Sequence, residues 1–279
     1  MNDCLVTTLN TVVDNSELPM LNAIKVTVHP TDDETHRRIT VNSTNLSDLE
    51  IITDGNHSYS VETISSGKRI TFENGEYNAF IKGKYDLTRL QIITGTGNPT
   101  DIGFDVKGIS YANKLTRLAL CGANISGNIE DLVVGSENNE NITYFEFYFS
   151  NISGNLESIQ NWINLEQLYF QKQGAFNSIQ VSGNIGTIVG KMTKLSSIWF
   201  NGAPNIVGSI ESVVENQCSN GRTSGTLTVR TNSIVTLNST NLADSTNLVL
   251  TYSTTGCNIS IDSNVVATYN KSTNTWTYA

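Results

Sequence analysis

Apolar residues alternate with polar ones in short runs through the middle of the chain, and the same phrase follows each run. The phrase is a branched apolar residue, then Ser-Gly-Asn, then a second apolar residue. It occupies residues 125–129, 152–156 and 181–185, with a degenerate copy at 206–210. Successive copies are 27, 29 and 25 residues apart. This is the period at which one supersecondary unit stacks on the next in a solenoid.

An apolar triplet at relative positions 1, 4 and 6 precedes each copy of the phrase. Positions 4 and 6 alternate as in a strand, so each triplet predicts a short strand with those two side chains inward. The triplets are Leu115/Leu118/Leu120, Ile142/Phe145/Phe147, Leu165/Leu168/Phe170 and Leu195/Ile198/Phe200. An earlier unit is indicated by Leu87-Thr88-Arg89-Leu90, which returns 28 residues later as Leu115-Thr116-Arg117-Leu118.

Short helical or 3-10 turns are expected after the phrases, over residues 130–134, 157–162, 188–192 and 211–217. Acidic residues lie near the start of three of them, where the helix dipole favours negative charge. The alternative is a β-rich domain that is not a solenoid and has a glycine-marked turn after each strand, because Ser-Gly pairs are ordinary turn signals.

Two regions without the repeat flank the array. We expect residues 1–86 to form an N-terminal arm and a β-rich cap, residues 87–226 the repeat array, and residues 227–279 a C-terminal β cap that ends in a hairpin. Alternating runs such as Ile24 to Val28 and Lys68 to Phe72 predict the strands of the first flank. Both ends of a solenoid leave apolar side chains and strand edges unpaired, so caps are expected there.

The repeat resembles the leucine-rich repeat, and its Ser-Gly step resembles the plant-type subclass of that family. Residues 115–129 and 142–156 match the frame L-x-x-L-x-L-x-x-N-x-L-S-G-x-I-P without a gap. The resemblance implies a mainly β, leucine-rich-repeat-like solenoid with short helical or 3-10 turns. Ala123 and Ser150 replace the family's buried asparagine. The family's proline is replaced by Glu130, Glu157, Gly186 and Glu211, and about six extra residues, Gly174 to Gln180, enter the third unit.

The repeat frame also predicts a candidate binding face. Positions 3, 5 and 7 of each strand point opposite to the buried pair, and they carry aromatic rings among amides and charges. The face comprises Arg117, Tyr144, Glu146, Tyr148, Gln167, Tyr169, Gln171, Trp199 and Asn201. Rings flanked by hydrogen-bonding groups suit a glycan or a protein partner. The alternative is that these rings only pack against neighbouring strands or under a flank.

Composition and charge exclude several classes of function. The chain has 15% charged residues, a net charge of −9 and no basic run, which argues against nucleic-acid binding because phosphate neutralisation needs clustered Lys and Arg. No segment approaches about 18 consecutive apolar residues, so no membrane insertion is expected. The N-terminus has no signal-peptide pattern. Gly95-Thr96-Gly97 lacks the rest of a nucleotide motif, and no cofactor is expected.

Residues that could carry catalysis or bind metal are scattered. Cys4, Cys121, Cys218 and Cys257 have no neighbouring histidine and no C-x-x-C spacing, so we expect no zinc site. A disulfide framework stays open, and Cys121 is expected on the exposed side or at the end of its strand. The three histidines have no motif partner. Glu130 and Glu157 share a repeat position and are expected about 5 Å apart, as a cation site or, more simply, as exposed acids.

Both ends of the chain resemble virion proteins encoded by phages of gut Bacteroidales. The resemblance rests on Cys4 to Leu9, Asn15 to Leu21 and the closing stretch from Thr268 to Tyr278. It implies a non-enzymatic tail, fibre or capsid-decorating component whose partners are other virion proteins or a host surface protein or glycan. A fibre component is compatible with a homo-oligomer. The alternatives are a bacterial cell-surface or secreted repeat adhesin and a polysaccharide-cleaving enzyme.

Overall fold

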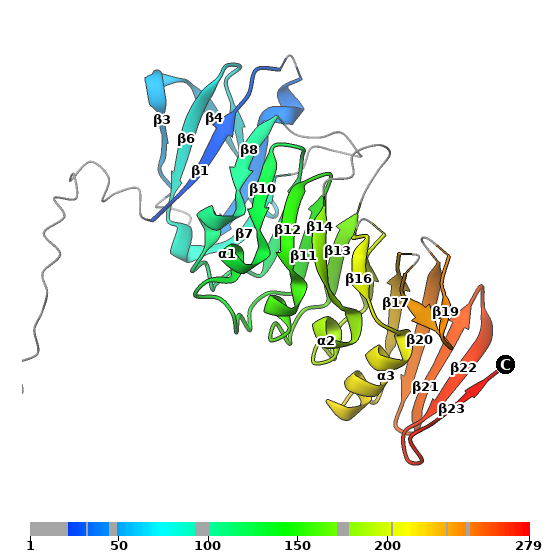
Figure 1. Cartoon of the computed structure of the whole chain (residues 1–279). Helices are drawn as coiled ribbons and strands as arrows, with labels where there is room; N and C mark the ends of the chain where they lie inside the picture. Colours follow the sequence, from blue (N-terminus) through cyan, green and yellow to red (C-terminus); the bar gives the residue numbers. More distant parts are fainter. Residues whose placement is uncertain are drawn as a thin grey trace, which may run out of the picture.

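The computed structural model describes residues 22–31, 33–44, 49–92, 101–171, 179–201, 203–232, 234–243 and 246–279. Within these residues the protein is mainly β, with a 13-stranded sheet, an 8-stranded sheet and a two-stranded ribbon. The elements follow one another along an elongated body, from the N-terminal strands to the C-terminal hairpin (Figure 1). No helix in this part of the chain is long and apolar enough to cross a membrane.

The 13-stranded sheet has the order β23-β22-β21-β20-β17-β15-β13-β11-β9-β7-β2-β5-β4. Its strands are β2 (Arg38–Ser43), β4 (Tyr59–Ile64), β5 (Gly67–Phe72), β7 (Leu87–Ile92), β9 (Arg117–Cys121), β11 (Tyr144–Tyr148), β13 (Gln167–Gln171), β15 (Ser197–Trp199), β17 (Thr226–Arg230), β20 (Asn247–Ser253), β21 (Gly256–Ile261), β22 (Asn264–Asn270) and β23 (Thr275–Tyr278). The pairs from β7 to β17 are parallel and the others are antiparallel.

The 8-stranded sheet has the order β16-β14-β12-β10-β8-β1-β6-β3. Its strands are β1 (Ala23–Val28), β3 (Ile51–Thr53), β6 (Tyr77–Lys82), β8 (Ile102–Asp105), β10 (Ile125–Asn128), β12 (Asn151–Asn155), β14 (Gln180–Asn184) and β16 (Asn205–Val207). The ribbon pairs β18 (Thr236–Leu237) with β19 (Thr240–Asn241). Strands β8 to β16 pair in parallel, so the repeat region adds one strand to each large sheet per unit.

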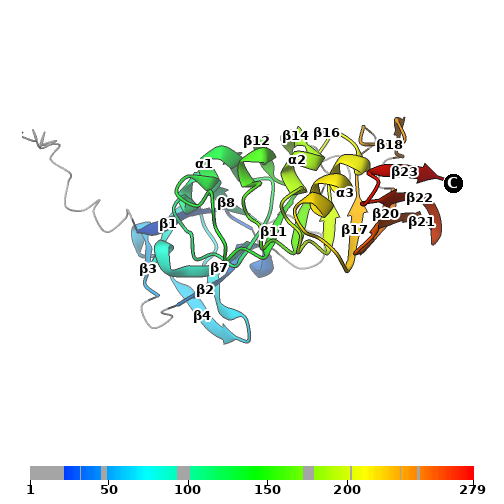
Figure 2. The same cartoon turned by 90° about the horizontal axis from the view of Figure 1, so that it is seen from below.

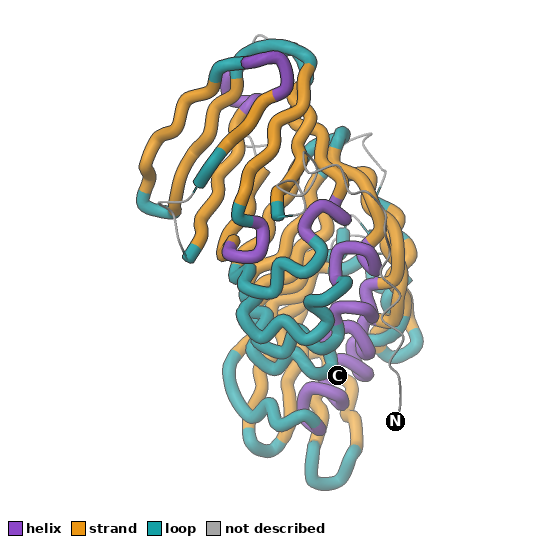
Figure 3. The backbone as a smooth tube through the Cα atoms, turned by 90° about the vertical axis from the view of Figure 1, so that its left-hand side faces the viewer, coloured by secondary structure: helices purple, strands orange, loops and turns teal. Residues whose placement is uncertain are grey.

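Helical turns join strands of one sheet to strands of the other. On one side of the body they are α1 (Ile129–Val133), α2 (Ile185–Val189), α3 (Ile210–Ser219), and the 3-10 turns η5 (Lys84–Asp86), η6 (Val106–Ile109) and η7 (Leu156–Ile159). The 3-10 turns η2 (Glu34–Arg37) and η4 (Asp54–Asn56) follow β1 and β3, which run antiparallel to β8 and β6, and so lie at the opposite ends of the strands. From below, α1, α2 and α3 form a row beside the 8-stranded sheet, while β7, β11 and β17 lie across from them (Figure 2). Figure 3 shows the same turns stacked in a column.

The core lies between the two sheets and is formed by the inward residues of the repeat. The eight side chains at positions 4 and 6 of the triplets are all 0% exposed, as the alternation predicts. They are Leu118, Leu120, Phe145, Phe147, Leu168, Phe170, Ile198 and Phe200. One continuous apolar cluster extends from them into both flanks.

The recurring Ser-Gly-Asn phrase makes a turn that fits against the preceding unit. Its glycines, at positions 127, 154, 183 and 208, have φ between 109° and 135°, where a side chain is strained. A Cβ on Gly154 would also lie 2.0 Å from Glu130 Oε2 and 2.6 Å from Asn128 Oδ1. The glycine is therefore required by both the backbone angle and the close approach of the previous unit.

The asparagine of the phrase caps the helical turn that follows it. Asn128 Oδ1 accepts a hydrogen bond from Glu130 N at 2.8 Å, and Asn155 Oδ1 accepts one from Glu157 N at 2.9 Å. The glutamates then reach the next unit: Glu130 Oε1 accepts from Asn155 N at 2.8 Å and Glu157 Oε1 from Asn184 N at 3.0 Å. Glu130 and Glu157 thus bond the backbone of successive units, a role that the sequence analysis did not identify.

Asn155→Ala should lower the free energy of unfolding by about 1 kcal/mol, because the first turn of η7 loses its side-chain acceptor. The measurement is chemical denaturation followed by circular dichroism. Asn138→Ala is the matched control, since Asn138 is exposed and no hydrogen bond to its side chain is found among the described residues. Equal stability of the two variants would show that the asparagine cap contributes nothing.

Two local expectations are corrected by the structure. Cys121 is the last residue of β9, one of the two expected positions, but its side chain is buried rather than exposed, and the bulkier Tyr148 lies beside it in the register. The helical turn expected at residues 188–192 is α2, which begins at Ile185. It begins earlier because Asn184 Oδ1 accepts from Gly186 N at 2.9 Å and so sets the first turn.

The two flanks continue the large sheets at their ends. In the first flank, β2, β4 and β5 extend the 13-stranded sheet, and β1, β3 and β6 extend the 8-stranded sheet. Residue 87 is the first residue of β7, whereas residue 227 lies inside β17, which still pairs in parallel with β15. The arm at residues 1–17, the N-terminal stretches that resemble virion proteins, and residues 174–178 of the third unit's insertion lie outside the described residues.

The C-terminal hairpin is fastened to α3 by two hydrogen bonds. The indole N–H of Trp276 donates to Glu215 Oε1 at 2.7 Å, and the hydroxyl of Tyr278 donates to Glu211 Oε1 at 2.9 Å. Glu211 also accepts from Asn238 N at 2.6 Å. These contacts connect β23, the last strand of the 13-stranded sheet, to the helical side of the body.

Candidate binding face

The parallel register places the predicted face residues in rows across neighbouring strands. One row passes from Arg117 to Tyr144 and Gln167, and a second from Glu146 to Tyr169 and Trp199. Tyr148 and Gln171 form a third row beside Cys121. Asn201 follows the end of β15 and has no strand partner. All nine predicted residues are half-buried, and the eight that lie in strands are on the face of the 13-stranded sheet that points away from the core.

The rings and two arginines of this face contact one another in sequence. The Arg117 guanidinium lies 3.3 Å from the Tyr144 ring centroid, and Tyr144 meets Tyr169 edge to face at 5.6 Å. Tyr169 and Trp199 have centroids 5.0 Å apart, and the Arg230 guanidinium lies 4.3 Å from the Trp199 ring. We call Arg117, Tyr144, Tyr169, Trp199 and Arg230 the aromatic row. Cross-strand contacts of this kind stabilise a sheet, so these rings have at least a packing role in the 13-stranded sheet.

Glu146 is fixed between two of its neighbours on the face. The Tyr144 hydroxyl donates to Glu146 Oε2 at 2.6 Å, and the Gln171 amide donates to Glu146 Oε1 at 3.2 Å. Burial, and then this hydrogen bond to the carboxylate, raise the pKa of Tyr144. Tyr144 is therefore a neutral donor at physiological pH, and Glu146 is oriented by two partners.

Two polar atoms at the β15 end of the face have no partner among the described residues. They are the indole nitrogen of Trp199 and Oδ1 of Asn201, and both atoms are buried. An unpaired buried polar group costs about 1–3 kcal/mol, so such a group needs an explanation. A ligand hydroxyl reached by a small side-chain movement would supply a partner for each.

Sequence reasoning missed two members of the face. Arg89 pairs in register with Arg117, and Arg230 pairs with Trp199. The signal for Arg89 was present, because Leu87-Thr88-Arg89-Leu90 repeats the unit that contains Arg117. Arg230 belongs to a further parallel strand, β17, which lacks the apolar triplet spacing of the earlier units.

Other polar clusters in the described residues are structural. His29 Nδ1 lies 3.0 Å from Glu76 Oε2, and His57 stacks on Tyr77 with centroids 3.9 Å apart. The side chain of His36 is not described. Three or more His, Cys, Asp or Glu side chains do not gather into a metal-binding group anywhere in the described residues.

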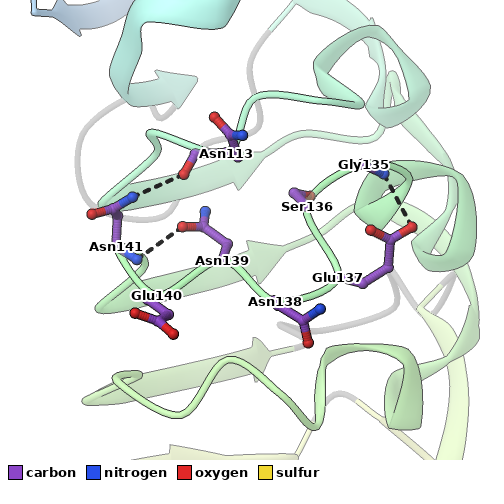
Figure 4. A pocket seen from close by; sticks show the side chains of 8 residues that line it. All are labelled: Asn113, Gly135, Ser136, Glu137, Asn138, Asn139, Glu140 and Asn141. Carbon is purple, nitrogen blue, oxygen red and sulfur yellow. Dashed lines mark hydrogen bonds between the residues drawn. The ribbon is translucent and has the colours of Figure 1, made fainter.

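An open polar hollow of about 450 Å³ lies in the loops beside α1 (Figure 4). The polar groups that line it hydrogen-bond mainly to one another. Gly135 N donates to Glu137 Oε1 at 3.1 Å, Asn141 N donates to Asn139 Oδ1 at 2.9 Å, and the Asn141 amide donates to the Asn113 carbonyl at 3.0 Å. These bonds give the polar residues of the hollow a structural role.

The chain was compared with protein-family models, with curated proteins and with solved structures. None of the three comparisons finds a match.

Proposed function

We propose that the protein is a non-enzymatic adhesion or structural protein that contacts a protein or glycan through the outer face of the 13-stranded sheet. The observation that carries this proposal is the aromatic row, which crosses five adjacent parallel strands. Tyrosine and tryptophan are favoured contact residues because they bury a large apolar area and still offer a polar group. Gln167 and Gln171 add amide donors and acceptors beside the rings.

We further propose that residues 87–226 form a leucine-rich-repeat-like solenoid. The support is that β9, β11, β13 and β15 align the same repeat positions side by side, while β10, β12, β14 and β16 do so in the other sheet. The asparagine caps and glutamate bonds recur at the repeat spacing. A stacked array of this kind presents a broad surface, which suits a contact function.

The place proposed for the protein is a phage virion, as a tail, fibre or capsid-decorating component assembled in the host cytoplasm. The support is the resemblance of both ends of the chain to virion proteins. The test is mass spectrometry of purified particles and of surface-shaved cells from the source culture. Many copies per particle would support the virion assignment, whereas recovery only from cell surfaces would replace it with the cell-surface adhesin.

Trp199→Ala should weaken adhesion at least about tenfold, because a central aromatic contact contributes about 2 kcal/mol or more. The measurement is binding of the labelled protein to cells of the source culture by flow cytometry. Val207→Ala is the control, since Val207 is exposed on the other sheet. If both variants bind as wild type and melt at the wild-type temperature, the aromatic row is a packing feature and the proposed face is wrong.

A further inference from the structure

Two arginines stand side by side at the β7 end of the candidate face. Arg89 and Arg117 are paired in register on neighbouring strands, which lie about 4.8 Å apart in a sheet. Both side chains are half-buried, and the Nε atoms of both are buried without a hydrogen-bond partner among the described residues. Arg89 donates to Gln91 Oε1 at 2.7 Å, and Arg117 lies over Tyr144.

These two charges are not balanced by an acid, although the chain as a whole is acidic, with a net charge of −9. Two other cations of the same region have carboxylate partners. Arg69 pairs with Glu62 at 2.9 Å, and Lys114 pairs with Asp86 at 2.6 Å. The described residues give Arg89 and Arg117 no such ion pair. Burial, and then the neighbouring Arg117 charge, lower the pKa of Arg89, as expected for two uncompensated cations.

An anion bound at this pair would offset the repulsion between the two guanidinium groups. It would also accept hydrogen bonds from N–H groups that have no partner among the described residues. Guanidinium groups bind carboxylates through two parallel N–H donors, which gives both strength and geometry. The only carboxylate within the rows described above, that of Glu146, is already held by Tyr144 and Gln171. A negative ligand group is therefore attracted to the Arg89 end and repelled from the middle of the face.

We infer that the Arg89–Arg117 pair binds the carboxylate of an acidic glycan whose sugar rings lie along the aromatic row. This inference rests on the proposed contact function of the face. From Arg89 on β7 to Arg230 on β17 the face spans five strand spacings, about 24 Å, the length of a short oligosaccharide. The strands' backbone groups are already paired within the sheet, so a peptide could add no main-chain bonds here. Ring faces and amides instead match sugar rings and hydroxyls.

The test is an array of acidic oligosaccharides, each printed beside its methyl ester, which keeps the sugar and removes the charge. Galacturonate, mannuronate and N-acetylneuraminate oligomers are the probes, with dextran sulfate and dextran as a further pair. We expect binding to a carboxylate member at least about tenfold tighter than to its ester, and an affinity that falls with salt. Arg89→Gln and Arg117→Gln should each remove this preference. Arg69→Gln, at an arginine that has its own acid, is the control.

Each outcome tests either the contact function of the face or its specificity for the carboxylate of an acidic glycan. Equal binding of acids and esters, lost in Trp199→Ala, would keep the contact face and overturn the acidic specificity. Binding to sulfate alone would also overturn the carboxylate assignment. Binding to no glycan would overturn the glycan inference, while the cell-adhesion measurement on Trp199→Ala would separately decide whether the face binds a protein. Thermal melting of each variant verifies that the fold is retained.

Discussion

Phe145→Ala should lower the free energy of unfolding by about 3–5 kcal/mol and the melting temperature by about 10 °C. Phe145 is fully buried and packs against three other rings, with centroids 5.1 Å from Phe147, 5.1 Å from Trp162 and 5.6 Å from Phe170. Alanine leaves a cavity and removes favourable edge contacts at once. Denaturant unfolding followed by tryptophan fluorescence measures the loss directly.

The controls for Phe145 separate core packing from sheet pairing. Phe145→Leu keeps most of the apolar volume and should cost clearly less than alanine. Tyr169→Ala removes a ring from the opposite face of the same sheet, where the side chain is only half-buried. A Phe145→Ala protein that unfolds at the wild-type denaturant concentration would show that the two sheets do not depend on this ring cluster.

The sequence predicts which strand side chains of the repeat are buried, because strand geometry fixes the face on which each one lies. Side chains alternate between the faces of a strand, so one buried residue fixes the side of its neighbours. Phe145 and Phe147 follow this rule, as do Leu168 and Phe170. Membership of the candidate face followed from the same alternation.

The exposure of that face could not be predicted so well, because exposure depends on neighbours that are distant in the sequence. Cys121 and Ala119 have the outward position but are small, and Tyr148 and Glu146 stand beside them in the register. Both small residues are therefore buried. The alternation gives the side on which a residue lies, whereas the sizes of its cross-strand neighbours determine how much water reaches it.

The pairing of the flank strands with the repeat strands also could not be predicted from the sequence. Caps were expected, and strands were expected within them, but the partner of each strand depends on long-range pairing. β2 joins β7 antiparallel, and β20 joins β17 antiparallel, so one sheet passes through both flanks. The same pairings cover both edges of the parallel strands in the 13-stranded sheet, whose backbone groups would otherwise be open to other chains.

The structure gives a different role to the acidic residues on the helical side from the one that the sequence indicates. Glu130 and Glu157 follow the repeat, which the sequence analysis explained as exposed acids or a cation site. Each instead accepts from a backbone N–H of the next unit. The carboxylate provides a specific hydrogen bond between units, so these acidic residues have a structural role in this chain.

The stability of the fold should fall steeply in alkaline solution because of two buried thiols. Burial raises the pKa of Cys121 and of Cys257 from 9.0 to about 12, with smaller contributions from Glu146 and Cys218 respectively. A thiol whose folded pKa is raised stays protonated in the folded chain while the unfolded chain loses its proton. The folded state therefore keeps its full stability below pH 9 and loses it as the pH rises from 9 towards 12.

Between pH 8 and 11 the two thiols together should cost about 5 kcal/mol. The measurement is denaturant unfolding at each pH in the presence of a reducing agent, for wild type and for the Cys121→Ala/Cys257→Ala variant. The variant still contains Cys218 and buried Tyr252, and burial raises the pKa of both groups. The difference between the two proteins therefore isolates the thiols. Parallel pH profiles would mean that the thiols ionise freely in the folded chain, and so that neither is buried as the register of β9 and β21 requires.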